Sequence, residues 1–266
     1  MSEKSDVQKK HFVLVHGFGL GAWCWFKLVS LLKKDGRHSV TALDLAACGV
    51  HPIQHHQISS FSDYVQPLID FLSALPNNER AVLVGHSYGG IPISIAAENF
   101  PEKISLAVFV TSYMPNCTEP ISILIKEFFK RNSNKPFMDC EFTFDSESGD
   151  VPTRGRLGHD YMAAKVYNHC QLEDLELGKL LVRPSLFYVK DLSKPGMLSQ
   201  ERYGKVKRCY VICGDDDVGD EEFQAYNIEK SPPDDVMTIA GAGHMVMLTK
   251  PQELCLCLLE LAEKYD

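Results

Sequence analysis

The chain has 266 residues, 45% hydrophobic and 23% charged, so it can build a sizeable core and is not intrinsically disordered. Its 27 Lys and Arg against 35 Asp and Glu give a net charge of −8, the wrong sign for a protein that neutralises nucleic-acid phosphates. No apolar run reaches the roughly 18 residues of a spanning helix, and residues 1–10 are polar where a secretory leader would be apolar, so we expect a cytoplasmic protein without membrane contact.

Short apolar runs rich in β-forming residues recur along the chain, each followed by small or polar residues. They predict strands at His11–Val15, Val40–Leu43, Ala81–Val84, Leu106–Val110, Tyr210–Cys213 and Val236–Ile239. Between them lie patterns typical of helices, one starting near Trp23 and others covering 61–75, Gly89–Asn99 and Pro251–Lys264. The alternation predicts an α/β fold in which a mostly parallel sheet has helices on both faces.

This alternation is interrupted after Val110. Helical stretches are predicted at 121–130, 161–170 and 172–182, a polar loop at 145–156, and strand signals return only at Tyr210. Long loops without structure of their own are rare in compact domains, so the segment predicts an inserted helical lid, or cap. We assign residues 113–190 to this cap and residues 1–112 and 191–266 to the core.

The segment Gly85-His86-Ser87-Tyr88-Gly89 is G-x-S-x-G between a predicted strand and a predicted helix. That context is typical of a nucleophile elbow, in which the glycines let strand and helix close around a strained serine. The helix N-terminus beside Ser87 favours developing negative charge. The alternative, a Gly-rich turn with an incidental serine, is disfavoured by the strand and helix on either side.

A catalytic serine needs a histidine base and a carboxylate that orients the base. His244 lies in a small-residue loop after the last predicted strand, whereas His159 and His169 fall on predicted cap helices, so we expect His244 to be the base. The acid is expected on a loop after an earlier strand, where residues 215–217 are three aspartates in a row. The pattern alone leaves all three open.

Acyl transfer also needs two preorganised hydrogen-bond donors for the oxyanion. The backbone N–H of Tyr88, directly after the serine, is the first. His16-Gly17-Phe18 matches the His-Gly start of the usual oxyanion loop, so the N–H of Phe18 is the second. The alternative is a glycine-rich segment that serves tight turning alone.

Other sequence features predict no metal or cofactor. Nine cysteines without any CxxC pair indicate reduced, mostly buried thiols. Near His51, His55 and His56, no fourth residue stands at a spacing that would let it complete a metal site with them. The segment from Gly17 to Gly21 is G-x-G-x-G, which lacks the last spacing of a dinucleotide loop.

Several motifs occur together over nearly the whole chain: His11–Gly17, Gly21–Trp25, Gly85–Ser87, Glu173–Leu177 with Arg183-Pro184, Arg202–Gly204 and His244-Met245. In this combination the sequence resembles the plant methylesterase and hydroxynitrile lyase family of α/β-hydrolases, and within it the esterases of indole-alkaloid synthesis. The resemblance implies the α/β-hydrolase fold, no cofactor, a small-molecule ester substrate and a homodimer.

Matched residue by residue, the resemblance implies that Ser87 is the nucleophile, His244 the base and Asp216, the middle aspartate, the acid. It also implies hydrolysis of a methyl ester of a plant specialised metabolite, with an indole-alkaloid ester preferred and a product acid that can lose carbon dioxide. The alternatives are methyl salicylate or methyl jasmonate as substrate, a decarboxylative cyclase or lyase, and a hormone receptor that binds without turnover.

Three further positions separate the branches of this family. The lyase branch has Thr, Glu and Lys where this chain has Gly17, His86 and Met245, which favours the esterase branch. We expect these residues to surround the substrate together with Phe128 and Tyr161 of the cap.

The chain also departs from the family pattern near the expected site. Phe18 and Gly19 stand where a small residue and Cys are usual, and Gly243 replaces the customary Asp before the histidine. The ring of Phe18 either narrows the acyl pocket or turns away from it.

Overall fold

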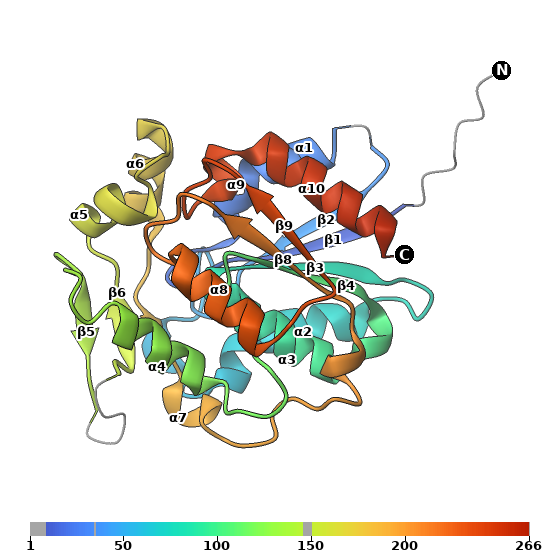
Figure 1. Ribbon diagram of the computed structural model, residues 1–266, viewed down its shortest axis with the longest axis horizontal. Helices are drawn as coiled ribbons and strands as arrows, with labels where there is room; N and C mark the ends of the chain where they lie inside the picture. Colours follow the sequence, from blue (N-terminus) through green and yellow to red (C-terminus); the bar gives the residue numbers. More distant parts are fainter. Residues whose placement is uncertain (1–8, 35, 146–150, 266) are drawn as a thin grey trace.

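The computed structural model describes residues 9–34, 36–145 and 151–265. Its centre is a parallel sheet in the order β2-β1-β3-β4-β8-β9 (Figure 1). The strands are β1 (His11–Val15), β2 (Ser39–Leu43), β3 (Ala81–His86), β4 (Ile104–Val110), β8 (Arg208–Cys213) and β9 (Asp235–Ile239). All six predicted strands are confirmed, and so is the parallel arrangement.

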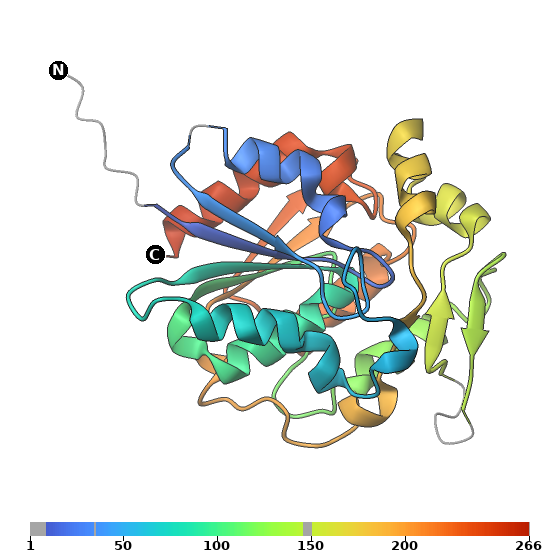
Figure 2. The ribbon, with the colours of Figure 1, turned by 180° about the vertical axis from the view of Figure 1, so that it is seen from behind.

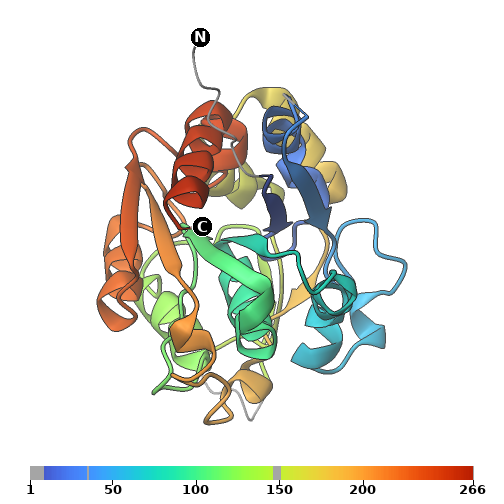
Figure 3. The ribbon, with the colours of Figure 1, turned by 90° about the vertical axis from the view of Figure 1, so that its right-hand side faces the viewer.

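Helices cover both faces of this sheet, as predicted (Figure 3). One face carries α1 (Phe26–Leu32), α9 (Val246–Thr249) and α10 (Pro251–Lys264); the other carries α2 (Phe61–Ala74), α3 (Gly90–Asn99) and α8 (Glu221–Lys230). Short 3-10 turns lie at Ala22–Trp25, His55–Gln57, Ser87–Gly89, Pro101–Lys103 and Tyr203–Lys205. The helix expected near Trp23 is thus a 3-10 turn that continues into α1, and α8 and α9 were not predicted.

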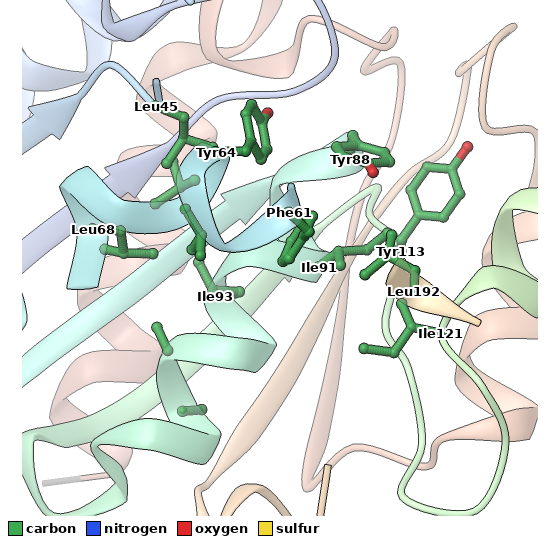
Figure 4. Close-up of a cluster of buried hydrophobic side chains, with 14 of the residues drawn as sticks. Leu45, Phe61, Tyr64, Leu68, Tyr88, Ile91, Ile93, Tyr113, Ile121 and Leu192 are labelled. Carbon is green, nitrogen blue, oxygen red and sulfur yellow. The ribbon is translucent and has the colours of Figure 1, made fainter. Parts of the chain in front are cut away.

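The sheet separates two apolar clusters that together form the core. Figure 4 shows part of one, in which Tyr64 and Leu68 of α2 lie beside Ile91 and Ile93 of α3. A Ser60 cap starts α2: its side chain accepts a hydrogen bond from the Asp63 N–H, and the Asp63 carboxylate accepts one from the Ser60 N–H. All six residues of β3 are buried, which fixes this strand in the middle of the sheet.

The cap lies between β4 and β8 and stands at one side of the sheet (Figures 1 and 2). It contains α4 (Ser122–Arg131), β5 (Glu141–Thr143), β6 (Arg154–Arg156), α5 (His159–Tyr161), a π-helical turn (Met162–Val166), α6 (Leu172–Leu181), β7 (Ser185–Leu186) and α7 (Val189–Leu192). The predicted boundaries at 113 and 190 fall in the loop after β4 and inside α7.

The predicted cap was helical, but β5, β6 and β7 form a small antiparallel sheet. Part of the polar loop expected at 145–156 is therefore strand, while residues 146–150 of that loop lie outside the described residues, as do residues 1–8 of the polar N-terminal segment. Each of these strands has two or three residues, which is too short for an alternating pattern to appear in the sequence.

Several polar contacts join cap and core, among them Asn168 with Asp217 and Lys135 with Asp220. The guanidinium of Arg183, just after α6, donates to the carbonyl oxygens of Gly49, His51 and Ile53 and to the side chain of Gln54 at 2.8–3.1 Å. Lys27 of α1 also pairs with Asp174 of α6 at 2.5 Å. No helix in the described part of the chain is both long and apolar enough to cross a bilayer.

Candidate active site

The turn after β3 holds Ser87 in a strained conformation. Its φ is +52°, in the left-handed region that non-glycine residues rarely adopt. The turn is this sharp because its glycines pack against backbone: a Cβ on Gly85 would lie 2.7 Å from the Gly89 carbonyl oxygen, and one on Gly89 would lie 2.6 Å from the His16 carbonyl oxygen. The turn therefore has the shape of the expected nucleophile elbow.

The backbone of Ser87 is fixed by residues that follow β4. Its carbonyl oxygen accepts hydrogen bonds from the Ser112 hydroxyl at 2.6 Å and from the Tyr113 N–H at 3.1 Å. Both donors come from the neighbouring strand's carboxyl end, where parallel strands bring their loops together. The strained backbone of Ser87 is thus held by two directed contacts from the residues after β4.

Asp216 is the one aspartate of the three that turns inward, whereas its two neighbours are exposed. One carboxylate oxygen accepts from His244 Nδ1 at 2.7 Å and from the Thr111 hydroxyl at 2.5 Å. The other accepts from the N–H groups of Val218 and Gly219 at 2.7 and 2.9 Å. The structure thus brings His244 together with the middle aspartate.

These contacts also govern the charge of Asp216. Burial by itself would raise the pKa of this carboxyl, but the nearby His244 and the hydrogen bonds from His244, Thr111 and Val218 hold it below its ordinary value. The group is therefore a carboxylate that fixes the His244 ring with its Nδ1 proton toward Asp216 and its Nε2 free.

Ser87 and His244 line the same cavity, but their side chains are not joined by a hydrogen bond in the described structure. Catalytic hydrogen bonds are often long or misaligned in free enzymes and tighten when the substrate binds. The structure thus brings the three side chains of the expected triad to one place, with the acid–base contact formed and the base–serine contact open.

The two expected oxyanion donors flank Ser87. Tyr88 stands in the first turn of the short helix that Ser87 begins, where backbone N–H groups lack intrahelical acceptors. Phe18 belongs to the loop after β1, and among the described residues its N–H has no hydrogen-bond acceptor. Gly17 lies between these elements, because a Cβ on it would be 3.0 Å from that of Ser87.

His86 is fully buried beneath the elbow and holds the base loop. Its Nε2 donates to the carbonyl oxygen of His244 at 2.8 Å, and its Nδ1 has no partner among the described residues. Burial, helped by the neighbouring His244, lowers the pKa of His86 to about 3, so the ring stays neutral. His86 therefore contacts the backbone of the base and does not reach the cavity.

The cavity beside Ser87 has a volume of about 70 Å³. Its described walls are aromatic and aliphatic side chains with a few small polar groups, and none is Lys, Arg, Asp or Glu. The lining residues are Phe18, Leu20, Ser87, Tyr88, Thr111, Tyr113, Phe128, Phe129, Phe137, Phe142, Leu157, Tyr161, Val166, Phe187, Val218, Gly219, Phe223 and His244.

Of the five expected pocket residues, the structure places Phe128 and Tyr161 on the wall of the cavity. Gly17, His86 and Met245 are buried beside it and are not part of the wall. Met245 is fully buried because its side chain packs into the core on the α10 face. The three positions lie behind the cavity wall, and the substrate contact expected for them stays a prediction.

Two groups of residues at this site were not found from the sequence. Thr111, with a φ of +38°, contacts the acid from the end of β4. Its position directly after a buried strand run was the available signal. Phe129, Phe142 and Phe187 complete the aromatic wall, but nothing in their local sequence distinguishes them from core residues.

Metal binding has no support in the described residues, where no group of three or more His, Cys, Asp or Glu side chains is arranged to hold an ion. His51, His55 and His56 stay near the surface, and the rings of His55 and His56 meet edge to face at 5.7 Å. His51 Nδ1 accepts instead from the Ile53 N–H.

Comparison with known proteins agrees with this fold. Residues 12–255 match the family model described as the alpha/beta hydrolase family. The chain therefore belongs to the α/β hydrolase family, and the resemblance stated from its motifs is confirmed at that level.

Similar proteins cover the whole domain. Methylesterase 10 of Arabidopsis thaliana is 47% identical over 97% of this chain and 94% of its own length. Polyneuridine aldehyde esterase of Rauvolfia serpentina is 41% identical over 98% of this chain and 99% of its own length. A crystal structure of a tomato methylketone synthase I variant complexed with β-ketoheptanoate has a TM-score of 0.89 at 42% identity and covers 98% of this chain and 100% of that one. Relatives named as esterases and methylesterases indicate a carboxylic ester hydrolase.

Proposed function

We propose that the protein is a serine carboxylesterase that hydrolyses a methyl ester of a specialised metabolite through an acyl-enzyme. The observation that carries this proposal is the contact of 2.7 Å between His244 and the buried Asp216, on the same cavity as the strained Ser87. A histidine oriented by a carboxylate beside a nucleophile that faces a cavity is the arrangement that acyl transfer requires.

In the proposed reaction the Ser87 oxygen attacks the ester carbonyl while His244 Nε2 takes the hydroxyl proton. Asp216 keeps the imidazole in the required tautomer and stabilises its cation. The N–H groups of Phe18 and Tyr88 bind the oxyanion. His244 returns the proton to the departing methoxide, methanol leaves, and a water molecule repeats the sequence to release the acid and restore Ser87.

The acyl part of the substrate enters the apolar cavity that the cap completes. Polyneuridine aldehyde esterase and Methylesterase 10 support methyl esters of specialised metabolites as the class to test. Indole-alkaloid methyl esters are the first candidates, and methyl jasmonate and methyl salicylate are the alternatives.

The test is methanol release and product mass spectrometry with a panel of these methyl esters. Steady release of methanol together with the free acid supports the proposal, provided that the Ser87→Ala variant releases none. Binding of the esters without any turnover would instead support a receptor, and turnover that is equal in the Ser87→Ala variant would contradict covalent catalysis.

A second candidate function is decarboxylation of a β-keto acid. The tomato methylketone synthase structure holds β-ketoheptanoate, and the cavity of this chain has described walls without a charged side chain that would stabilise a carboxylate. A β-keto or β-formyl acid released by the esterase would lose carbon dioxide without a further catalytic group. Carbon dioxide release from a free β-keto acid, without a methyl ester, distinguishes this activity from hydrolysis.

A further inference from the structure

The ring of Phe18 turns into the cavity wall. It lies parallel to the ring of Phe187, with 4.2 Å between the centroids and 10° between the planes. Its other neighbour is Tyr88, whose ring meets it edge to face at 6.1 Å. Of the two orientations that the sequence left open, the structure has the one in which the ring occupies space next to the nucleophile.

The backbone of Phe187, the partner of Phe18, is fixed by two hydrogen bonds. The Phe187 N–H donates to the Thr153 carbonyl oxygen at 2.9 Å, and the Phe187 carbonyl oxygen accepts from the Tyr88 hydroxyl at 2.7 Å. The Phe187 side chain is buried and its ring meets that of Phe129 edge to face at 5.3 Å. Phe18 is thus stacked on a buried ring whose backbone is fixed by two hydrogen bonds and whose side chain packs against Phe129.

The cap closes over the pair from a second direction. A Cβ on Gly155 of β6 would lie 3.2 Å from the tip of the Phe18 ring and 2.9 Å from the ring of Phe142. The backbone of β6 therefore packs directly against both rings. Phe18 is enclosed by Phe187, Tyr88 and this strand, which leaves its ring few ways to make room for a substrate.

The remaining space is small for an organic substrate. Pockets that take drug-sized ligands have volumes of about 300–1,000 Å³, whereas this cavity has about 70 Å³. Its described walls carry no charged side chain, and more than half of them are Phe or Tyr. Aromatic faces and edges favour flat, uncharged rings as partners.

We propose that Phe18 sets the acyl specificity of this enzyme: stacked on Phe187, it restricts the substrate to methyl esters with a flat, uncharged acyl group and excludes bulky, three-dimensional ones. This inference rests on the proposed methylesterase function and narrows it: it moves the expected substrate from three-dimensional polycyclic alkaloid esters to methyl esters with a flat acyl group, such as methyl salicylate. Removing the ring opens space on the order of 100 Å³, which a compact polycyclic acyl group can then occupy.

The experiment compares methyl 2-naphthoate, whose acyl group is flat, with methyl adamantane-1-carboxylate, whose acyl group is a cage with the same number of ring carbons. Wild type should favour the flat ester. In Phe18→Ala the ratio of kcat/KM for the cage ester to that for the flat ester should rise by about tenfold or more, and in Phe18→Leu by less. Thermal unfolding of each variant establishes that it is folded.

Two control variants make the comparison specific. Phe137→Ala removes a ring from the same cavity that does not touch Phe18, and it should change the ratio much less. Phe26→Ala removes an exposed ring outside the cavity and should leave the ratio unchanged. An unchanged ratio in Phe18→Ala, or an equal change in Phe137→Ala, would overturn the proposal.

Binding separates this inference from the proposed function. The affinities of both esters are measured by calorimetry in Ser87→Ala and in Ser87→Ala combined with Phe18→Ala, so that no turnover is needed. A shift of the affinity ratio toward the cage ester supports the role of Phe18 even if wild type hydrolyses neither ester. Hydrolysis by wild type with no shift in either ratio would retain the esterase and refute the role of Phe18.

Discussion

The core and the cap contribute to the site by different physical means. In the core, Asp216 accepts four hydrogen bonds and the Ser87 carbonyl accepts two, so the reacting groups are held by short, directed contacts. The cap contributes rings such as Phe129, Phe142 and Phe187, which pack without direction of their own. The core thus fixes the positions of the reacting groups, whereas the volume and shape of the cavity determine which acyl groups fit.

This difference predicts how each region responds to substitution. A change of one polar atom in the core breaks a contact that has no substitute, so its effect on turnover is large. A change of a ring on the cavity wall alters which acyl groups fit and leaves the reacting groups in place, with the largest effect expected at Phe18 in the loop after β1. The following predictions test this division, starting from the largest effect.

Removal of the nucleophile should have the largest effect. Ser87→Ala should lower kcat by about 10⁶-fold, because the serine and histidine act as a unit. Steady-state methanol release measures the loss, and circular dichroism with thermal unfolding checks that the fold is retained. A folded variant with turnover near that of wild type would exclude Ser87 as the nucleophile.

Substitution of the acid should cost less but still distinguish among the three aspartates. Asp216→Asn should lower kcat by about 10⁴-fold, because an amide stabilises the wrong tautomer of His244. Asp215→Asn and Asp217→Asn are matched controls, since both side chains are exposed, and should change kcat by less than about threefold. A larger loss in either control would move the assignment of the acid.

The ion pair between Lys27 of the core and Asp174 of the cap should affect the stability of the protein. Lys27→Met leaves Asp174, which is 2% exposed, without its cationic partner and should lower the free energy of unfolding by about 3 kcal/mol. The double variant Lys27→Met with Asp174→Leu should recover much of this loss, because no buried charge remains. Urea unfolding measures both, and a double variant that is as unstable as Lys27→Met would contradict the explanation.

The last effect is close to zero at neutral pH and grows only in acid: it is a pH dependence of stability that comes from His86. Its pKa is about 3 in the folded protein against an ordinary value of 6.5, so the unfolded chain takes up a proton that the folded chain does not. Above pH 6.5 His86 is neutral in both states and does not lower the free energy of unfolding. As the pH falls from 6.5 toward 3, the free energy of unfolding decreases by up to about 1.4 kcal/mol per pH unit.

His86→Gln should make the fall in unfolding free energy over this pH range less steep. The exposed His56 provides the control, and His56→Gln should keep the slope of wild type. Urea unfolding at several pH values measures both slopes. Equal slopes in wild type and His86→Gln would show that the buried ring does not carry the effect.

The core was predictable because its signals are local. The central strands β1, β3 and β4 are largely buried apolar runs, and the elbow motif spans only five residues. That Ser87, Asp216 and His244 meet follows from their positions after parallel strands, since such loops share one edge of the sheet. The inward turn of Asp216, in contrast, depends on donors such as Thr111 from another strand, so the three aspartates look alike in sequence.

The cap was less predictable because its structure depends on distant contacts. Its strands are two or three residues long and gain their hydrogen bonds from one another. The orientation of Phe18 depends on Phe187, which lies far away in the chain and is fixed by Thr153 and Tyr88. No local pattern of charge or hydropathy encodes such an arrangement.

Arg183 has a consequence for exchanging parts between homologous enzymes. Its guanidinium donates hydrogen bonds to the carbonyl oxygens of residues 49, 51 and 53. The conformation of the loop after β2 is therefore matched to one cap side chain. Because the contacts are to backbone, they constrain the path of that loop more than its side chains. A chimaera in which the cap comes from a homologous enzyme should therefore also receive the segment of that enzyme that corresponds to residues 48–54.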